Sequence, residues 1–407
     1  MEWNGQQAAA LSKVSQWLKD RDQPVFRLFG YAGTGKTTLA KHLASGLNGR
    51  TIYAAYTGKA ALVMQKAGCI GAQTIHSLIY TPYDPNDAQA RMLALNKLIA
   101  DEEDEVQADH LRQELRALED AARTSDKPKL SFILNEESQL NQAALLVVDE
   151  CSMVNEDMAR DLMSFNVPIL VLGDPAQLPP VKGVGFFTEA TPDVMLTEIM
   201  RQARDNPIIN LATQVRENGR LIPGGYGDSG VIVGGKPSIE ELLAFNQVLV
   251  GKNLTRQAMN RFIRKQMKHD SPIPLEGDRL ICLRNNKEEG LLNGGMWICG
   301  ADAEETNGDD RMVDLWALRS DDTDAKKDYL RAFRHILIGE ERRMYSWEWA
   351  DGQEFDYAYA ITCHKSQGSQ WPSVAVFDES GVFRDNATRW LYTAITRAQE
   401  SVKIYRK

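Results

Sequence analysis

The chain has 407 residues, 43% hydrophobic and 25% charged, which is typical of a globular protein with about two to four domains and excludes wholesale disorder. It has no apolar run of roughly 18 residues and opens with MEWNGQQAAA, so we expect neither a membrane span nor a signal peptide. The net charge of −9 disfavours a nucleic-acid partner only at first sight. Residues 84–127 hold 12 acids against 6 bases and residues 301–325 hold 9 against 2, so the remaining chain is positive on balance.

The five cysteines have no zinc-binding spacing, which favours reduced thiols and a cytoplasmic location.

The first half of the chain alternates predicted helices and strands. Residues 7–19 carry apolar side chains every three or four positions, which predicts a helix. Apolar runs predict four strands, at residues 25–29, 51–55, 145–148 and 168–172. We expect a helix to about residue 47 after the first strand, and a loop that leads into a helix over 56–68 after the second. This alternation indicates an α/β fold with a parallel sheet, whose polar residues lie at the carboxyl ends of the strands.

Residues 86–123 interrupt this pattern with apolar side chains at helical spacing. They predict one long helix or a helical hairpin that breaks near the acidic residues 101–105. The segment is either a solvated amphipathic insertion or an arm that docks a partner. After it, residues 129–138 predict a short hairpin.

The second half begins with the glycine- and proline-rich residues 221–237, which predict turns. Residues 247–250 predict a strand that leads into a basic helix ending near Arg264. Short strands and turn signals over 272–350 predict a small β-rich module. The α/β pattern then returns, with strands expected at residues 357–362, 374–378 and 402–405.

A phosphate-binding loop is the strongest chemical signal. The sequence GYAGTGKT matches GxxxxGK[ST] between a strand and a helix, so its glycines allow backbone N–H groups to surround phosphates. We expect ATP to bind Gly30, Tyr31, Ala32, Gly33, Thr34, Gly35, Lys36, Thr37 and Thr38.

A second motif, an acidic pair at the end of the strand at 145–148, completes the expected ATP site. We expect Thr37 and Asp149 to hold Mg²⁺ and Glu150 to activate the attacking water. The alternatives are a chance glycine-rich turn and an acidic pair that caps a helix.

Seven further segments resemble, in order, the motifs of superfamily 1 helicases. GDPAQLPPV (173–181), TCHKSQGSQWPSV (362–374) and LYTAITRAQESV (391–402) resemble motifs III, V and VI, and YTGKAA (56–61) with AQTIHSL (72–78) resembles motif Ia and the segment after it. DECSM (149–153) and LTEIMRQARDNPII (196–209) resemble motifs II and IV of the RecD/Dda-like branch, which includes the Pif-type enzymes. The compact Dda-like phage helicases are the nearest likeness.

This resemblance implies two RecA-like P-loop domains with parallel sheets and ATP between them. The first would comprise residues 1–76 and 140–198, interrupted at 77–139 by the helical insertion and a pin hairpin. The second would comprise 199–271 and 351–407, interrupted at 272–350 by an SH3-like β-rich insertion.

The resemblance also assigns residues of the ATP site. Gln177 would sense the γ-phosphate, and Arg201 and Arg397 would reach it from the second domain as arginine fingers. Gln6 would read adenine, with Gln7 as the adjacent alternative, and Gln367 would link the ATP site to the strand. Structural salt bridges for the arginines and a helix cap for the glutamine remain alternatives.

Contacts to DNA are implied in the same way. The backbone would be held by Thr57, Lys59, Thr74, His76, Thr362, His364, Lys365 and Ser366. Pro82 would stack on a base and Phe132 would act at the pin. The alternatives are loop caps, interdomain hydrogen bonds and ordinary packing.

The resulting expectation is an ATP-dependent DNA helicase that moves 5′→3′ on single-stranded DNA and unwinds forked duplexes as a monomer. Its setting would be the bacterial or phage-infected cytoplasm, in replication, recombination or repair. A single-strand-binding or replication protein could dock on residues 86–123. An RNA-directed superfamily 1 ATPase and a RecD-type subunit of a larger complex are the alternatives.

Overall fold

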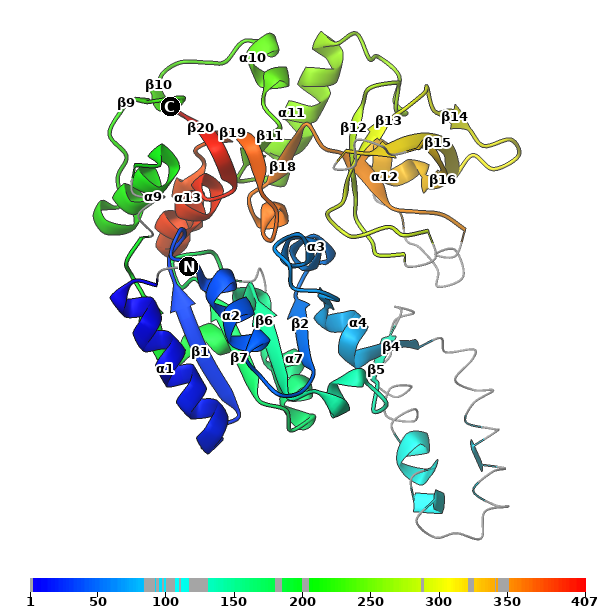
Figure 1. Cartoon of the computed structure of the whole chain (residues 1–407). Coiled ribbons are helices and arrows are strands. Elements are labelled where there is room, and N and C mark those ends of the chain that lie inside the picture. Colours follow the sequence, from blue (N-terminus) through cyan, green and yellow to red (C-terminus); the bar gives the residue numbers. More distant parts are fainter. Residues whose placement is uncertain are drawn as a thin grey trace.

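The computed structural model describes residues 3–83, 92, 95–96, 99, 107–109, 111–116, 131–179, 185–199, 205–286, 289–320, 326–340, 342 and 351–407. It places two α/β domains one above the other, with a β-rich module beside the upper domain (Figure 1). Within these ranges, every helix is too short or too polar to cross a membrane.

A six-stranded parallel sheet forms the first domain. Its order is β3-β2-β6-β7-β1-β8, with β1 at Val25–Gly30, β2 at Thr51–Ala55, β3 at Gln73–Thr74, β6 at Leu145–Asp149, β7 at Ile169–Gly173 and β8 at Val194–Leu196. The four predicted strands are present, whereas β3 and β8 were not predicted.

Helices cover both faces of this sheet, which explains why its central strands are apolar throughout. One face packs against α1 (Gly5–Asp20), α2 (Lys36–Ser45) and α3 (Gly58–Lys66). The other packs against α4 (Ile75–Ile79), α7 (Glu156–Ser164) and α8 (Phe186–Glu189). The polar carboxyl ends of the strands therefore meet at the edge that faces the second domain (Figure 1).

The insertion in the first domain differs from its prediction in one respect. Residues 129–138 do not form a hairpin by themselves, because β5 (Ser131–Leu134) pairs antiparallel with β4 (Tyr80–Tyr83), which precedes the insertion. Leu95 is buried and packs with Leu111 and Leu115. Residues 16 to 20 apart in one straight helix would lie about 24–30 Å apart, so this contact excludes one uninterrupted straight helix from Leu95 to Leu115. Of the other residues in the predicted insertion, 86–123, the structure describes only 92, 96, 99, 107–109, 112–114 and 116.

The second domain contains another six-stranded sheet, parallel except at its edge. Its order is β18-β11-β19-β20-β10-β9, with β9 at Gly224–Tyr226, β10 at Ser229–Val233, β11 at Gln247–Val250, β18 at Ala360–Thr362, β19 at Trp371–Phe377 and β20 at Ala398–Arg406. Helices α9 (Pro207–Asn218) and α13 (Ala387–Ile395) cover one face, and α10 (Ile239–Ala244) and α11 (Asn253–Gln266) cover the other. The turns predicted at 221–237 include the one that joins β9 to β10, whereas the two strands of this hairpin were not predicted.

The third sheet forms a separate antiparallel unit, here called the β-module. It has the order β14-β15-β13-β12-β17, with β16 paired to β15, and its strands are β12 (Arg279–Cys282), β13 (Met296–Cys299), β14 (Glu304–Glu305), β15 (Met312–Arg319), β16 (Asp328–Phe333) and β17 (Phe355–Tyr357), with α12 at Arg334–Ile338. The single strand expected at 357–362 is therefore two strands in two sheets.

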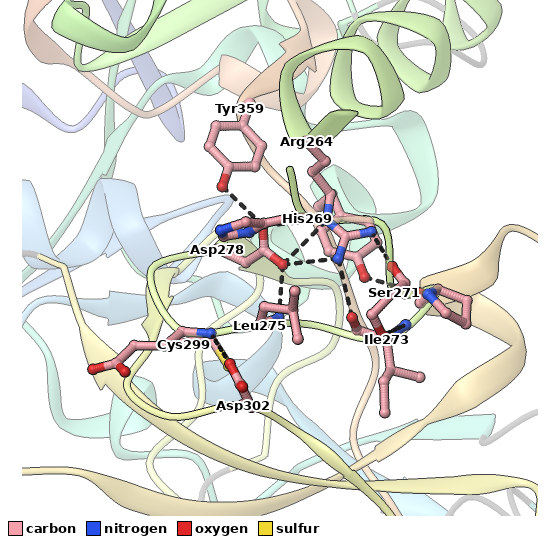
Figure 2. Close-up of polar contacts among 12 residues, drawn as sticks. Arg264, His269, Ser271, Ile273, Leu275, Asp278, Cys299, Asp302 and Tyr359 are labelled. Carbon is pink, nitrogen blue, oxygen red and sulfur yellow. Dashed lines mark hydrogen bonds and ion pairs between the residues drawn. The ribbon is translucent and has the colours of Figure 1, made fainter. Parts of the chain in front are cut away.

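A buried carboxylate joins the β-module to the second domain (Figure 2). Asp278, directly before β12, is 0% exposed and accepts hydrogen bonds from Nε of Arg264 (3.1 Å), the hydroxyl of Tyr359 (2.8 Å) and the backbone N–H of Leu275 (2.8 Å). Nδ1 of His269 lies 3.1 Å from the same carboxylate. Arg264 belongs to α11 and Tyr359 precedes β18, so the contacts anchor the β-module on the second domain.

Candidate ATP site and nucleic-acid interface

The P-loop follows β1 and leads into α2, as the sequence motif predicts. Gly33 (φ 78°) and Gly35 (φ 81°) adopt left-handed backbone conformations that favour glycine. A Cβ atom on Gly30 would lie 2.6 Å from Oγ1 of Thr34, which itself donates a hydrogen bond to the Tyr31 carbonyl (2.8 Å). The loop is thus closely packed, with the N-terminus of α2 facing its centre, where an anion is stabilised.

Lys36 and Thr37 lie at the mouth of the loop. Nζ of Lys36 donates hydrogen bonds to the carbonyls of Gly30 (2.7 Å) and Tyr31 (3.2 Å). Oγ1 of Thr37 donates to Oδ2 of Asp149 (2.9 Å), at the end of β6. A hydroxyl and a carboxylate in contact are oxygen donors of the kind that Mg²⁺ prefers, so the residues fit the metal.

Glu150 occupies a strained position directly after β6. Its φ of 52° is left-handed, which is costly for a residue other than glycine and is often found at functional sites. Burial raises the pKa of the Glu150 carboxyl, and the nearby charge of Arg397 counteracts this rise. A raised pKa makes the carboxylate a better proton acceptor near neutral pH.

A cavity of about 330 Å³ separates the two domains at this point. The first domain contributes the P-loop, the acidic pair and Gln177, and the second domain contributes Ile208, Ile209, Gly368, Gln370, Thr396, Arg397 and Ala398. The cavity therefore brings Lys36, Glu150 and Arg397 to one space from opposite domains.

Arg397 is 2% exposed and its partners are neutral. Its guanidinium donates to the carbonyls of Thr393 (3.1 Å) and Ser369 (3.4 Å) and to Oγ1 of Thr396 (3.3 Å). Among the described residues it forms no ion pair, so the salt-bridge alternative is not realised. The Glu150 carboxylate acts on this guanidinium electrostatically without an ion pair, and both line the cavity in which an anionic ligand would meet the arginine. Arg201, the second expected arginine finger, lies outside the described residues.

The two glutamines expected at the cleft are both buried. Gln177 lines the cavity, and Nε2 of Gln367 donates to the Leu178 carbonyl across the domain interface (2.8 Å). The Oε1 atoms of both have no hydrogen-bond partner within the described part of the chain. Such unpartnered acceptors are costly unless a ligand or a water supplies a donor.

Gln6 and Gln7 divide the expected roles. Gln7 forms a capping box with Asn4 at the start of α1, and its Nε2 also donates to the Thr34 carbonyl of the P-loop (3.0 Å). Oε1 of Gln6 accepts from the backbone N–H groups of Thr197 (2.8 Å) and Glu198 (3.0 Å). The cap therefore belongs to Gln7, and Gln6 holds the segment after β8.

Several residues expected at the DNA have local structural contacts. Thr57 caps α3 and Thr74 caps α4 by accepting hydrogen bonds from the backbone N–H groups of Ala60 and Ser77, both at 3.1 Å. Oγ1 of Thr362 accepts from the backbone N–H of Lys365 (3.3 Å).

Lys59, Lys365 and Ser366 take part in contacts of the second domain. Nζ of Lys59 lies 4.7 Å from the ring centroid of Trp371, and Nζ of Lys365 donates to Oδ1 of Asn293 in the β-module (2.7 Å). Ser366 is 0% exposed and donates to the Cys363 carbonyl (2.7 Å). Its hydroxyl therefore lies out of reach of a bound strand in this arrangement, contrary to the expectation.

An aromatic cluster lies between α4 and the β4–β5 pair. The His76 ring contacts the rings of Tyr56 (5.9 Å between centroids), Tyr80 (5.6 Å) and Phe132 (6.1 Å). Phe132 is 50% exposed, which differs from ordinary core packing. Burial lowers the pKa of His76, so the ring is neutral at pH 7.

Two further residues, His364 and Pro82, were expected to contact DNA. His364 packs instead against Phe383 (5.4 Å), and burial lowers its pKa too. Pro82 lies in β4, but its side chain is outside the described part.

Sequence reasoning missed two residues of the cleft, Tyr392 and Asp174. The Tyr392 hydroxyl donates to Oδ2 of Asp174 (2.8 Å) and accepts from the Ala32 N–H (2.9 Å). The available signal was their position: Tyr392 precedes Arg397 by five residues in one motif, and Asp174 precedes Gln177 by three in another.

Comparison with known proteins agrees with this geometry. Residues 2–235 match a family model described as an AAA domain, and residues 357–405 match a UvrD-like helicase C-terminal domain. The chain is similar to the ATP-dependent RecD2 DNA helicase of Deinococcus radiodurans, with 24% identity over 289 residues, 63% of this chain and 35% of that protein. An uncharacterized protein of Acanthamoeba polyphaga mimivirus is 27% identical over 214 residues, 49% of this chain and 39% of that protein. The chain thus spans less than two fifths of the length of either relative.

Solved structures of Pif1 helicases share the fold. Two coordinating Pif1 helicases at forked dsDNA match with a TM-score of 0.53 and 19% identity, over 99% of this chain and 92% of that one. Pif1 from Bacteroides with ADP-AlF3 and ssDNA gives 0.51 and 19% over the same shares, and Pif1 from Candida albicans gives 0.50 and 17% over 100% and 94%. Since the AAA model covers more than half of its length, the chain belongs to the AAA-domain family, and its last part is similar to the UvrD-like helicase C-terminal domain.

Proposed function

We propose that the protein is an ATP-dependent DNA helicase that moves 5′→3′ on single-stranded DNA and unwinds duplex DNA. The observation that carries this proposal is the interdomain cavity, in which Lys36 and Glu150 of the first domain face Arg397 of the second. A nucleotide bound there contacts both domains, so its hydrolysis changes how they are held together.

The residues of the cavity supply the parts that phosphoryl transfer needs. Backbone N–H groups of the P-loop and the Lys36 ammonium hold the phosphates, while Glu150 orients the attacking water and accepts its proton. Arg397 stabilises the negative charge that spreads over the γ-oxygens in the transition state. Thr37 and Asp149 would hold Mg²⁺, which would neutralise phosphate charge when bound.

The second domain and the β-module are expected to move together. Asp278 and Arg264 join them through buried contacts, which would need to break before either could shift alone. Opening and closing of the cleft therefore displaces both relative to the first domain, where the His76–Phe132 cluster offers aromatic rings to bases.

DNA is favoured as the substrate by the names of the relatives. The Deinococcus protein is called a DNA helicase, and the Bacteroides Pif1 structure contains ssDNA. The direction of movement rests on the resemblance to the RecD/Dda-like branch. A comparison of ATPase stimulation by poly-dT and poly-U distinguishes this proposal from an RNA-directed ATPase.

Unwinding of duplexes that carry a single tail tests the function directly. We expect unwinding of a 5′-tailed duplex in the presence of Mg-ATP and none of a 3′-tailed duplex. Lys36→Ala should abolish both ATP hydrolysis and unwinding, because it removes the ammonium from the phosphate loop. Lys41→Ala is the matched control, since Lys41 lies on the same helix but donates to the Ala67 carbonyl at the surface. Unwinding from the 3′ tail alone would refute the direction, and an active Lys36→Ala variant would refute the site.

A further inference from the structure

Tyr392 joins the second domain to the P-loop through a single hydroxyl. It lies on α13 and is 2% exposed, whereas its partners Ala32 and Asp174 belong to the first domain. The phenol oxygen accepts a hydrogen bond from the Ala32 N–H (2.9 Å), and its O–H donates to Oδ2 of Asp174 (2.8 Å). One side chain thus bridges a P-loop amide and a carboxylate that lines the ATP cavity.

The direction of these hydrogen bonds is fixed by chemistry. Burial and the neighbouring charge of Asp174 raise the pKa of Tyr392, so the phenol stays protonated at neutral pH. A protonated phenol donates one hydrogen bond and accepts another, which matches the carboxylate on one side and the amide on the other. Linked hydrogen bonds of this kind polarise one another and hold their members in place.

The residue after Tyr392 extends this link to Arg397. Oγ1 of Thr393 accepts a hydrogen bond from the Leu178 N–H of the first domain (2.9 Å), and the Thr393 carbonyl accepts one from Nε of Arg397 (3.1 Å). Thr393 is 0% exposed, so both bonds lie in the interior. The position of Arg397 therefore follows that of Tyr392 and Thr393, which contact the first domain directly.

A second contact of the same kind lies beside the first. The guanidinium of Arg216, on α9, lies 3.7 Å from the ring centroid of Tyr31, the P-loop residue before Ala32. Residues 31 and 32 of the P-loop are thus both held by the second domain.

We propose that Tyr392 is a positioning residue for ATP hydrolysis, whose hydroxyl sets the P-loop and Arg397 in register across the cleft. The inference rests on the proposed ATPase function. The hydroxyl is the essential group, because a phenylalanine ring would fill the same space without joining Ala32 to Asp174. Loss of the bridge removes no side chain that contacts ATP. The distance between the P-loop and Arg397 is then no longer fixed.

The test compares Tyr392→Phe with Tyr405→Phe. The Tyr405 hydroxyl also donates to a carboxylate, Oε1 of Glu241 at 2.8 Å, within the second domain and away from the cavity lining. We expect Tyr392→Phe to lower kcat of DNA-stimulated ATP hydrolysis by about 10- to 100-fold, as misplacement of a transition-state group does. KM for ATP and the affinity for a non-hydrolysable ATP analogue should change by less than about twofold. Tyr405→Phe should leave all three unchanged.

Hydrogen exchange gives a readout that does not depend on hydrolysis. Amides of a peptide covering residues 28–36 should exchange faster in Tyr392→Phe than in the wild type, because Ala32 loses its acceptor. Exchange in the β-module should be equal in both, which controls for the fold. An unchanged kcat of Tyr392→Phe would overturn the inference whatever the exchange shows, and so would unchanged P-loop exchange or a rise in KM at constant kcat.

The same experiment separates this inference from the proposed function. If the wild type fails to hydrolyse ATP, or Lys36→Ala hydrolyses it normally, the proposed ATPase is refuted and the positioning role falls with it. The exchange of residues 28–36 then still decides whether the hydroxyl joins the domains. If Lys36→Ala is inactive and Tyr392→Phe is fully active, the function stands and only the role of Tyr392 is refuted.

Discussion

Asp278→Asn tests whether the buried ion pair anchors the β-module. The Asp278 side chain is 0% exposed and that of Arg264 is 9% exposed, with Nη2 of Arg264 at 3.0 Å from Oδ2 of Asp278. The asparagine keeps the shape but removes the charge, which leaves the guanidinium buried without a counter-ion. Removal of one partner of a buried pair costs about 3–5 kcal/mol, so we expect the free energy of unfolding to fall by about that amount.

Asp314→Asn is the matched control in the same module. Asp314 accepts hydrogen bonds from the hydroxyls of Thr306 (2.8 Å) and Tyr329 (2.9 Å) and lies 3.5 Å from Nε of Arg331. Its side chain is 27% exposed and that of Arg331 is 47% exposed, so water screens the pair. A screened pair of this kind contributes less than about 1 kcal/mol.

Urea unfolding measures both variants, followed by tryptophan fluorescence and by far-ultraviolet circular dichroism. The β-module contains Trp297 and Trp316, so early loss of the module would separate the two signals. The double variant Arg264→Gln with Asp278→Asn should cost less than the sum of the single variants, because neither charge is then left alone. Equal destabilisation by Asp278→Asn and Asp314→Asn would refute the reasoning.

The ATP site gives two further predictions. Arg397→Lys should lower kcat by about 10²- to 10³-fold with little change in affinity for an ATP analogue, because lysine lacks the guanidinium fork; a normal kcat in steady-state assays would contradict this. The raised pKa of Glu150 means that the folded state binds its proton more tightly than the unfolded state, so this carboxylate destabilises the fold as pH rises above the ordinary glutamate value of 4.5. Glu150→Gln should therefore raise the melting temperature at pH 7 while abolishing hydrolysis. In the wild type, kcat should fall as pH decreases, with a midpoint above the pKa of an ordinary glutamate. A midpoint at the ordinary glutamate pKa would contradict the shift.

The central strands of both α/β domains could be predicted because their burial on two faces leaves a continuous apolar run. Residues 51–55 and 247–250 have the predicted bounds. β5 could not be paired from sequence, since its partner β4 lies across the insertion and the pairing depends on tertiary contacts. The apolar run at 357–362 did not show that the chain passes from one sheet to another there. The buried residues of β17 and β18 and the residues between them form one continuous apolar pattern.

Residues of the ATP site could be predicted where they belong to one local motif. Contacts between segments that are distant in the sequence could not be predicted. Lys36, Thr37 and their neighbours follow from one loop whose spacing is set by phosphate geometry. The bond between Ala32 and Tyr392 spans 360 positions, and a tyrosine in an apolar helix gives no sign of what its hydroxyl contacts. The assignment of Gln6 and Gln7 depended on helix register at α1, which a cap at Asn4 decides.

The short turn between β18 and β19 links the β-module to the ATP cavity. Lys365 contacts the β-module through Asn293, and Gln367, two residues later, contacts Leu178 beside the cavity. Ser366 lies between them, and its hydroxyl donates a hydrogen bond to the Cys363 carbonyl within the same turn. A turn braced in this way moves as one piece, so a displacement of Lys365 by a bound phosphate would shift Gln367 as well. Burial lowers the pKa of Lys365, and an anion close to its Nζ would counteract this shift by favouring the charged form.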